Sequence, residues 1–251
     1  MILDEIIRQT EKRVAKLPAT FPDAPPNSRV SLIDAIHNAR GRNAVIAEIK
    51  CASPSRGVIR RNIDMAMMAG VLVRGGCIGV SVLTEPYFFG GTLQDITRVK
   101  SAVDVPVLRK DFIIDERQIA ETRALGADAI LLIAAVLGER LPAFVDASIE
   151  ACLEPLVEVH NPDDVKIALA TRANLIGINN RDLSTLAIDR STTRLLSGQV
   201  RLAGRTIVSE SGMRSADDVR EMRSYCDAFL IGSAIMADAE PGRRLEEFVC
   251  A

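Results

Sequence analysis

The chain has no tryptophan and few aromatic residues of any kind. Its 251 residues include two Tyr and seven Phe, so aromatics make up only 4%. Proteins that bind single-stranded nucleic acid without sequence preference stack the bases on aromatic side chains, and this composition disfavours that class. The formal net charge of −2 is also unlike that of a general nucleic-acid binder. We expect no nucleic-acid partner, although a local basic pocket stays compatible with these numbers.

Long hydrophobic runs are absent as well. The longest uncharged apolar run, Ala129–Leu137, has nine residues, whereas a membrane-spanning helix needs about 20. The N-terminus opens with Asp4, Glu5 and Arg8 and has no apolar stretch of the signal-peptide kind. The five cysteines are odd in number, widely spaced and without a Cys-x-x-Cys motif. These features predict a reduced, cytoplasmic protein with no membrane partner.

Histidine is scarce, and its scarcity limits the chemistry. Only His37 and His160 are present, which excludes a metal site built on several histidines. We interpret His160 as a loop residue and His37 as structural. Catalysis must then depend mainly on Lys, Glu, Asp, Asn or Ser.

The first 43 residues differ from the rest of the chain. The apolar spacing predicts helices over Ile2–Leu17 and Ser31–Arg40, with Ser31 as the N-cap of the second. Pro18–Pro26 holds four prolines and is predicted to be a loop. Residues 1–43 are too few for a core of their own. We expect a helical extension that packs on a single catalytic domain formed by residues 44–251.

From residue 44 onward, short β-branched runs alternate with amphipathic stretches. Eight runs are predicted to be strands: Val45–Ile49, Ile78–Leu83, Val105–Leu108, Ala129–Ile133, Pro155–Val159, Leu175–Ile178, Thr206–Ser209 and Ala228–Ile231. Strands that alternate with helices form a parallel sheet. Eight such units in about 200 residues favour an α/β fold, a closed (β/α)8 TIM barrel, over an open sheet.

Polar or small residues follow most of these runs, where a barrel carries its chemistry. They are Glu48 with Lys50, Lys110, Glu158, Asn179, Glu210 and the pair Gly232–Ser233. Glu48 and Lys50 are two residues apart and should face the same side of their strand. Any one of these residues could be a solvated strand end, but their recurrence at corresponding positions favours a site.

Lysine usage supports the same conclusion. Only six of the 31 basic residues are Lys, and two of them, Lys50 and Lys110, end predicted strands. Lysine can be tuned as a proton donor, whereas arginine stays protonated. Ser209–Gly212 and Gly232–Ser233 follow the last two runs and could bind phosphate, although such short motifs are more often ordinary turns.

Seven segments together resemble the indole-3-glycerol phosphate synthase family, and the resemblance covers essentially the whole chain. They are Ile46–Gly57, Ser81–Gly91, Leu108–Asp115, Leu156–Pro162, Ile176–Leu183, Ser209–Met213 and Leu230–Met236. The resemblance implies ring closure of a carboxyphenylamino-deoxyribulose 5-phosphate, with loss of CO2 and water, in tryptophan biosynthesis. It implies no metal or organic cofactor, and it leaves association with other tryptophan-pathway enzymes open.

The resemblance also implies roles for individual residues. Lys110 would be the main acid, and Lys50 would hold an anionic group of the substrate or assist as an acid. Glu158 would stabilise the substrate nitrogen or take a proton, while Glu48 and Asn179 would orient the hydroxyl. The implied phosphate ligands are Ser53, Ser211, Gly212, Gly232 and Ser233. The implied apolar lining is Phe89, Phe112, Leu131, Leu183 and Ile231, with Arg181 near the substrate carboxylate or Glu48 and with Glu210 hydrogen-bonded to the substrate.

Three other functions remain open on the sequence alone. The chain could be a barrel isomerase that acts on phosphoribosylanthranilate, because fold alone does not separate the two activities. It could perform Schiff-base aldol chemistry through Lys110. It could also be an inactive barrel that only binds a phosphorylated ligand or acts as a scaffold for a pathway complex.

Overall fold

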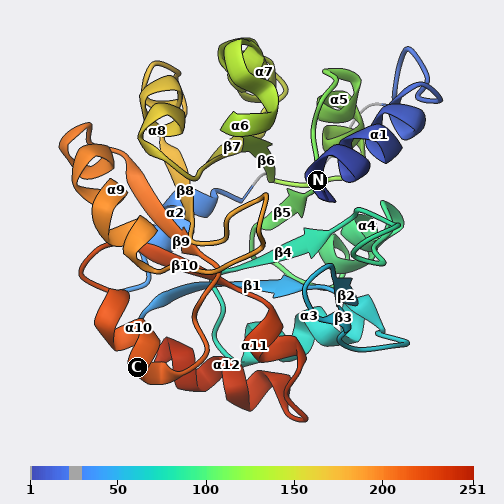
Figure 1. The fold of residues 1–251 in the computed structure, drawn as a ribbon. Coiled ribbons are helices and arrows are strands. Elements are labelled where there is room, and N and C mark those ends of the chain that lie inside the picture. The colour runs from blue at the N-terminus through green and yellow to red at the C-terminus, as the bar shows by residue number, and fades with distance from the viewer. Residues whose placement is uncertain (1, 23–29) are drawn as a thin grey trace.

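Eight parallel strands close into a barrel in the computed structural model, which describes residues 2–22 and 30–251 (Figure 1). The strands are β1 (Ala44–Ile49), β4 (Gly79–Leu83), β5 (Val107–Lys110), β6 (Ala129–Ile133), β7 (Glu154–Val159), β8 (Leu175–Asn179), β9 (Thr206–Glu210) and β10 (Ala228–Ile231). They are neighbours in chain order, and β1 pairs with both β10 and β4 to complete the circle. The predicted (β/α)8 barrel is confirmed.

Helices surround the barrel on its outside (Figure 1). They are α3 (Met65–Arg74), α4 (Gln94–Lys100), α5 (Arg117–Ala124), α6 (Ala134–Leu137), α7 (Leu141–Glu150), α8 (Pro162–Leu169), α9 (Ser191–Leu202), α10 (Ala216–Met222), α11 (Ser233–Met236) and α12 (Pro241–Val249), with a 3-10 turn at Gly138–Arg140. None of the described helices has both the length and the apolar character needed to cross a bilayer. A small antiparallel hairpin, β2 (Ala52–Ser53) and β3 (Gly57–Val58), follows β1 and was not predicted.

The predicted strands agree with the structure to within two residues at each end. The largest difference is at β5, which was expected at Val105–Leu108 and begins at Val107. Pro106 has no N–H to donate to a neighbouring strand, although its carbonyl accepts a hydrogen bond from Val80 N at 2.9 Å. The strand therefore starts after the proline and ends at Lys110, the residue expected at its end.

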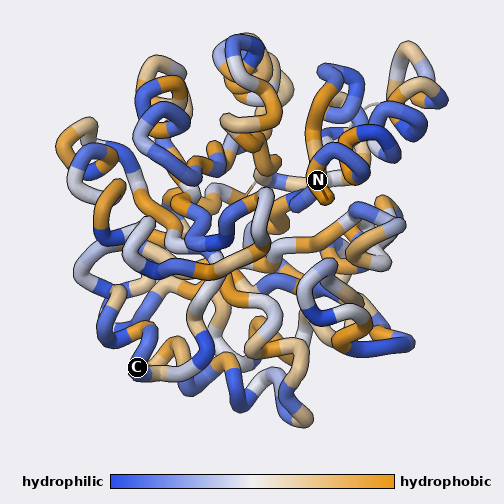
Figure 2. Tube along the Cα trace, viewed as in Figure 1, coloured by the Kyte–Doolittle hydropathy of each residue, from blue (hydrophilic) through white to orange (hydrophobic). Residues whose placement is uncertain are grey.

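Side chains alternate between the barrel interior and the layer beneath the helices. On β1, Ala44 and Ile46 belong to the interior cluster, whereas Val45, Ala47 and Ile49 belong to the outer one. Figure 2 shows hydrophobic residues along the strands and mixed residues along the outer helices. Because alternate residues share a face, Glu48 continues the interior row of β1.

The N-terminal segment forms α1 (Ile2–Val14) and α2 (Leu32–His37). The predicted N-cap of the second helix is confirmed, since the Ser31 side chain accepts a hydrogen bond from Asp34 N. Leu32 and Ile36 of α2 belong to the interior cluster, at the end where the strands begin. The first helix stops at Val14 rather than Leu17. Of the predicted loop Pro18–Pro26, residues 18–22 are non-helical, and the rest lie outside the described residues.

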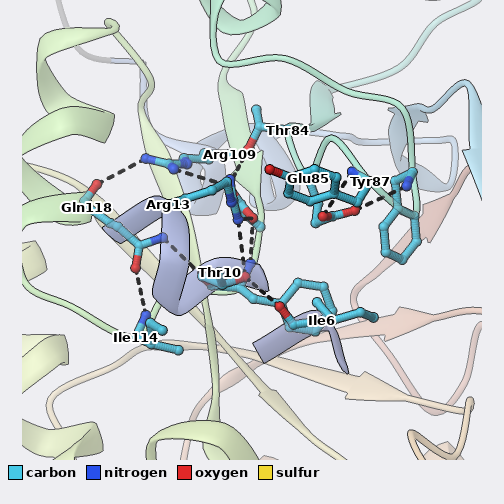
Figure 3. Close-up of polar contacts among 12 residues, drawn as sticks. Ile6, Thr10, Arg13, Thr84, Glu85, Tyr87, Arg109, Ile114 and Gln118 are labelled. Atoms are coloured by element: carbon cyan, nitrogen blue, oxygen red, sulfur yellow. Dashed lines mark hydrogen bonds and ion pairs between the residues drawn. The ribbon is translucent and has the colours of Figure 1, made fainter. Parts of the chain in front are cut away.

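An ion-pair network ties α1 to the barrel (Figure 3). The Arg13 guanidinium donates to both oxygens of Asp111, at 2.9 and 3.2 Å. Asp111 also accepts from Thr84 Oγ1 at 2.8 Å and from Arg109 at 3.1 Å. Arg109 is 1% exposed and pairs with Glu121 at 2.9 Å. One buried arginine therefore neutralises two carboxylates beneath the helix.

We expect Arg109→Met to destabilise the fold by about 3–5 kcal/mol, because Glu121 loses its cation and buried Asp111 keeps only Arg13. The methionine keeps much of the apolar volume, so the loss reports mainly on charge. Arg172 pairs with Asp146 at the surface, with 65% and 47% of the two side chains exposed. Arg172→Met should change the free energy of unfolding by less than about 1 kcal/mol. Urea unfolding of both variants measures this, and equal losses would contradict the assignment.

Candidate active site

One pocket lies at the end of the barrel where the strands finish, and its volume is about 420 Å³. This volume is typical of small-molecule sites. The structure brings all the residues implied by the resemblance to its walls: Glu48, Lys50, Ser53, Phe89, Lys110, Phe112, Leu131, Glu158, Asn179, Arg181, Leu183, Glu210, Ser211, Gly212, Ile231, Gly232 and Ser233.

A buried lysine lies between two carboxylates at the bottom of this pocket. Lys110 Nζ is 2.9 Å from Glu158 Oε2 and 2.9 Å from Glu210 Oε2. Burial disfavours the ammonium, but the charges of Glu158, Glu210 and Glu48 outweigh it and raise the pKa of Lys110 above its ordinary value. The side chain is therefore a charged donor at neutral pH.

The two carboxylates have different proton affinities. Burial works to raise the pKa of Glu158, but Lys110 and His160 outweigh it and hold that pKa well below its ordinary range. Burial raises the pKa of Glu210 to about 7, opposed by Lys110 and assisted by the nearby charge of Glu158. Two carboxyl groups whose environments separate their pKa values are typical of an acid and base pair.

Two glycines leave space for carboxylates at the bottom of the pocket. A Cβ atom on Gly177 would lie 2.1 Å from Glu210 Oε1, and one on Gly232 would lie 2.3 Å from Glu48 Oε1. Neither separation is sterically allowed for a real side chain. A side chain at Gly177 or Gly232 would displace a carboxylate that is paired with Lys110 or Lys50. The neighbouring acids therefore explain these glycines better than the backbone angles do, since neither has a positive φ.

Glu48 and Lys50 form an ion pair at the mouth, so the two side chains lie on the same side, as their spacing predicted. Next to them, Asn179 Oδ1 accepts a hydrogen bond from the backbone N of Arg181 at 3.0 Å. The Arg181 side chain donates to Leu186 O at 2.9 Å, which fixes the loop after β8 against the pocket.

Three guanidinium groups make the rim of the pocket basic. Arg56, Arg181 and Arg214 all line it. Burial lowers the pKa of Arg181, Glu48 opposes this, and the charges of Arg56 and Arg214 lower the pKa further. Arginines held this close to one another are suited to an anionic ligand.

The apolar wall is built from β4, β5 and α1. The rings of Phe89 and Phe112 are 6.3 Å apart between centroids. Buried Glu85 accepts hydrogen bonds from the backbone N–H groups of Tyr87, Phe88 and Phe89 and so fixes the loop that carries Phe89. Ile2, Leu3 and Ile6 of α1 also line the pocket and belong to the same apolar cluster, so the N-terminal helix is part of the site.

Small residues at the ends of β9 and β10 form the remaining side. Ser211 and Gly212 both have positive φ, 63° and 92°, which turns the chain sharply after β9. Ser53 Oγ is buried and has no hydrogen-bond partner among the described residues. A free hydroxyl, a sharp turn of small residues and the nearby lining residue Arg214 suit a phosphate group.

Sequence reasoning missed two groups of lining residues. Arg56 and Arg214 look like ordinary members of an arginine-rich chain, and no local pattern marks them. The residues of α1 that line the pocket, such as Ile6, were expected only to pack on the barrel. The sequence did contain a signal for this role, which is the apolar face of the helix. Ile2 and Leu3 extend this face beyond the part that the barrel alone must bury.

Comparisons with known proteins give a consistent result. Residues 3–248 match the model of the family described as indole-3-glycerol phosphate synthase. Curated relatives with that name include one from Thermoanaerobacter sp. (strain X514), 39% identical over 99% of this chain and 97% of its own. Another, from Bordetella pertussis, is 44% identical over 84% of this chain and 81% of its own.

Solved structures agree on the fold. A tryptophan synthase chain from M. tuberculosis superposes with a TM-score of 0.64 at 16% identity, covering 89% of this chain and 98% of its own. The tryptophan synthase alpha chain from Legionella pneumophila gives 0.64 at 11% identity, covering 86% and 94%. Identities this low support the barrel alone, whereas the family model and the curated relatives cover nearly all of the sequence. The chain belongs to the indole-3-glycerol phosphate synthase family.

Proposed function

We propose that this protein is an indole-3-glycerol phosphate synthase of tryptophan biosynthesis, a decarboxylating lyase. It would convert 1-(2-carboxyphenylamino)-1-deoxyribulose 5-phosphate to indole-3-glycerol phosphate. The observation that carries this proposal is the buried Lys110 held by Glu158 and Glu210, below a pocket with one apolar wall and one anion-binding side. A substrate with an aromatic ring at one end and a phosphate at the other matches both sides.

The reaction requires both acids and a base. In ring closure, the aromatic carbon that bears the carboxylate attacks the ketone carbon, and the ketone oxygen takes a proton. The bond to the carboxylate then breaks, CO2 leaves, and its electron pair restores the aromatic ring. In dehydration, a second proton leaves with the hydroxyl as water, and a base removes a proton from the adjacent carbon. One proton is consumed overall, which matches the loss of one carboxylate charge.

Lys110 is suited to the first proton transfer. It is a charged donor within the pocket, and its two carboxylate partners hold its ammonium in one place. Glu210, whose pKa is raised to about 7, lies 2.9 Å away and can return the proton. Glu158 is ionised at neutral pH and is therefore available to accept a proton.

Glu48, Lys50 and Asn179 would serve the hydroxyl and the substrate carboxylate. Lys50 is paired with Glu48 at the mouth, where it can bind an anion or protonate the departing hydroxyl. Asn179 and Glu48 offer oxygens that can orient this hydroxyl. Arg181 would bind the substrate carboxylate from the rim, where Arg56 adds positive charge.

Ligand contacts follow from the shape of the pocket. The phosphate would lie against Ser211, Gly212, Gly232 and Ser233, with Ser53 as a further donor. The aromatic ring would lie against the apolar lining formed by Phe89, Phe112, Leu131, Leu183 and Ile231. The expected partner is therefore a phosphorylated small molecule. A cytoplasmic location and association with other pathway enzymes stay predictions.

Schiff-base chemistry at Lys110 is the weaker reading of the same site. An imine forms from a neutral amine, and enzymes that use this step lower the pKa of their lysine. Here Glu158 and Glu210 raise the pKa of Lys110 instead. The charged form of the side chain favours proton donation over nucleophilic attack.

Lys110→Met should lower kcat by about a hundred- to ten-thousand-fold, because the ketone oxygen loses its proton donor. Product fluorescence in the presence of a chelator measures turnover, and thermal unfolding checks that the fold is retained. Exposed Lys166 on α8 provides the matched control, and Lys166→Met should keep normal turnover. Near-normal turnover in Lys110→Met would remove the proposed acid.

Ser233→Glu should raise KM at least about tenfold, because a carboxylate would face the substrate phosphate at short range. The same charge added at Ser101→Glu, at the exposed end of α4 and outside the pocket, should leave KM unchanged. Initial rates against substrate concentration measure both. An unchanged KM in Ser233→Glu would show that the phosphate binds elsewhere.

A further inference from the structure

A row of charged groups extends from Lys110 outward through β7 to the start of α8. Lys110 Nζ is 2.9 Å from Glu158 Oε2, and Glu158 Oε1 is 3.3 Å from His160 Nε2. The other ring nitrogen of His160, Nδ1, is 3.5 Å from Asp164 Oδ2. His160 is not among the residues that line the pocket. It therefore contacts Glu158 from behind, without reaching the substrate.

The local sequence fixes this histidine in place. Asn161 is the N-cap of α8, and its side chain accepts from Asp164 N at 2.9 Å. This turns the first residues of the helix so that Asp164 Oδ2 also accepts from the backbone N of His160 at 2.9 Å. The same carboxylate thus bonds to the backbone of His160 and lies 3.5 Å from its ring, whose side chain is 11% exposed. The ring contacts to Asp164 and Glu158 are charge contacts, because neither ring nitrogen makes a hydrogen bond within the described residues.

Glu158 and Glu210 differ in the surroundings of their second oxygen. Both acids offer one oxygen to Lys110 at the same distance. The second oxygen of Glu158 faces the imidazole of His160, whereas that of Glu210 is buried without a hydrogen-bond partner among the described residues. His160 is therefore the group that distinguishes two otherwise similar carboxylates.

We propose that His160 is a positioning residue, a cation held by Asp164 that keeps Glu158 ionised and oriented, so that Glu158 rather than Glu210 accepts the proton during turnover. This inference rests on the proposed function and adds to it a residue outside the substrate pocket. It gives the second histidine of the chain a role in the reaction, in place of the loop role expected from sequence.

The charges around this row support the assignment. Burial disfavours the imidazolium, but Asp164 and Glu158 outweigh it and raise the pKa of His160 to about 9. Glu158 is faced by Lys110 from β5, by Glu210 from β9 and by His160, and the two cations hold its pKa low despite burial. Glu48 of β1 acts on this row through Lys110.

The direction of the pH dependence follows. A raised pKa means that His160 is charged below about pH 9 and neutral above it. Glu158 is already ionised at that pH, so loss of the imidazolium there should cost little activity. Removing the cation by mutation raises the pKa of Glu158 instead, and the effect appears at the acid side of the profile.

Nuclear magnetic resonance tests the charge state without any substrate. The only other histidine, His37, contacts Thr206 at the opposite end of the barrel, 3.1 Å between Nε2 and Oγ1. In a His37→Gln background, His160 is the sole histidine and its ring signals are unambiguous. They should titrate with a midpoint near 9, and Glu158→Gln should lower that midpoint by at least about one unit, since a facing carboxylate is lost. A midpoint at the ordinary value for histidine, or one that Glu158→Gln leaves unchanged, would overturn the proposal.

Turnover as a function of pH tests the positioning role. His160→Gln should move the acid limb of kcat to higher pH by about one unit, a ~tenfold loss on that limb, with KM within about twofold. His160→Lys retains a cation and should recover most of the shift, while His37→Gln should match the unmodified protein. A loss of kcat that is equal at every pH, or one accompanied by a lower melting temperature, would show a purely structural role.

The turnover measurement and the magnetic resonance titration distinguish a failure of the proposed function from a failure of the role of His160. If the unmodified protein does not form indole-3-glycerol phosphate, the proposed function fails, and the magnetic resonance titration still decides whether His160 is a cation paired with Glu158. If turnover is normal and the titration midpoint is ordinary, the further inference alone fails.

Discussion

The ammonium of Lys110 is the charge around which the site is organised. An uncompensated ammonium in a protein interior costs several kcal/mol, so it must be matched by acids in good geometry. Here the partners come from β7 and β9, and neither strand is next to β5 in the barrel. The three side chains meet only because the sheet is closed. Barrel closure and the charge cluster therefore depend on each other, and the cluster cannot form in an open sheet with the same strands.

This charge cluster limits which residue types fit at the neighbouring positions of the barrel. Glu210 Oε1 fills the space over Gly177, and Glu48 Oε1 fills the space over Gly232. A glycine in a strand usually weakens it. In this barrel Gly177 of β8 is such a glycine, whereas Gly232 follows β10, and at both positions a carboxylate lies against the backbone. The glycines and the acids thus form one feature, although they are far apart in the sequence.

The barrel and most of its charged layer could be predicted from the sequence, because both depend on local patterns. Apolar runs mark the strands, and a polar residue at the end of a run marks the mouth, as Glu158 and Lys110 illustrate. The predictions missed contacts that depend on chain segments meeting in space. Arg13 reaches Asp111 across 98 residues, and Ile6 reaches the pocket only because of that anchor. His160 could not be paired with Glu158 from spacing alone, because the turn between β7 and α8 decides where its ring points.

Charge balance links the charged side chains of the site, although they are far apart in the sequence. The charged layer at the bottom of the pocket holds three carboxylates, Glu48, Glu158 and Glu210. It also holds two ammonium groups, Lys50 and Lys110. The pKa of Glu210 is raised to about 7, so partial protonation of this acid at neutral pH brings the layer close to neutral. His160 faces Glu158 from outside the pocket lining, and Asp164 balances its charge there. The rim above carries an excess of guanidinium charge. In the proposed reaction, the rim would bind the substrate carboxylate, while the ketone would enter a layer that is close to neutral. Proton transfers in that layer move charge between neighbouring groups and do not create a new net charge inside the protein, which keeps their electrostatic cost low.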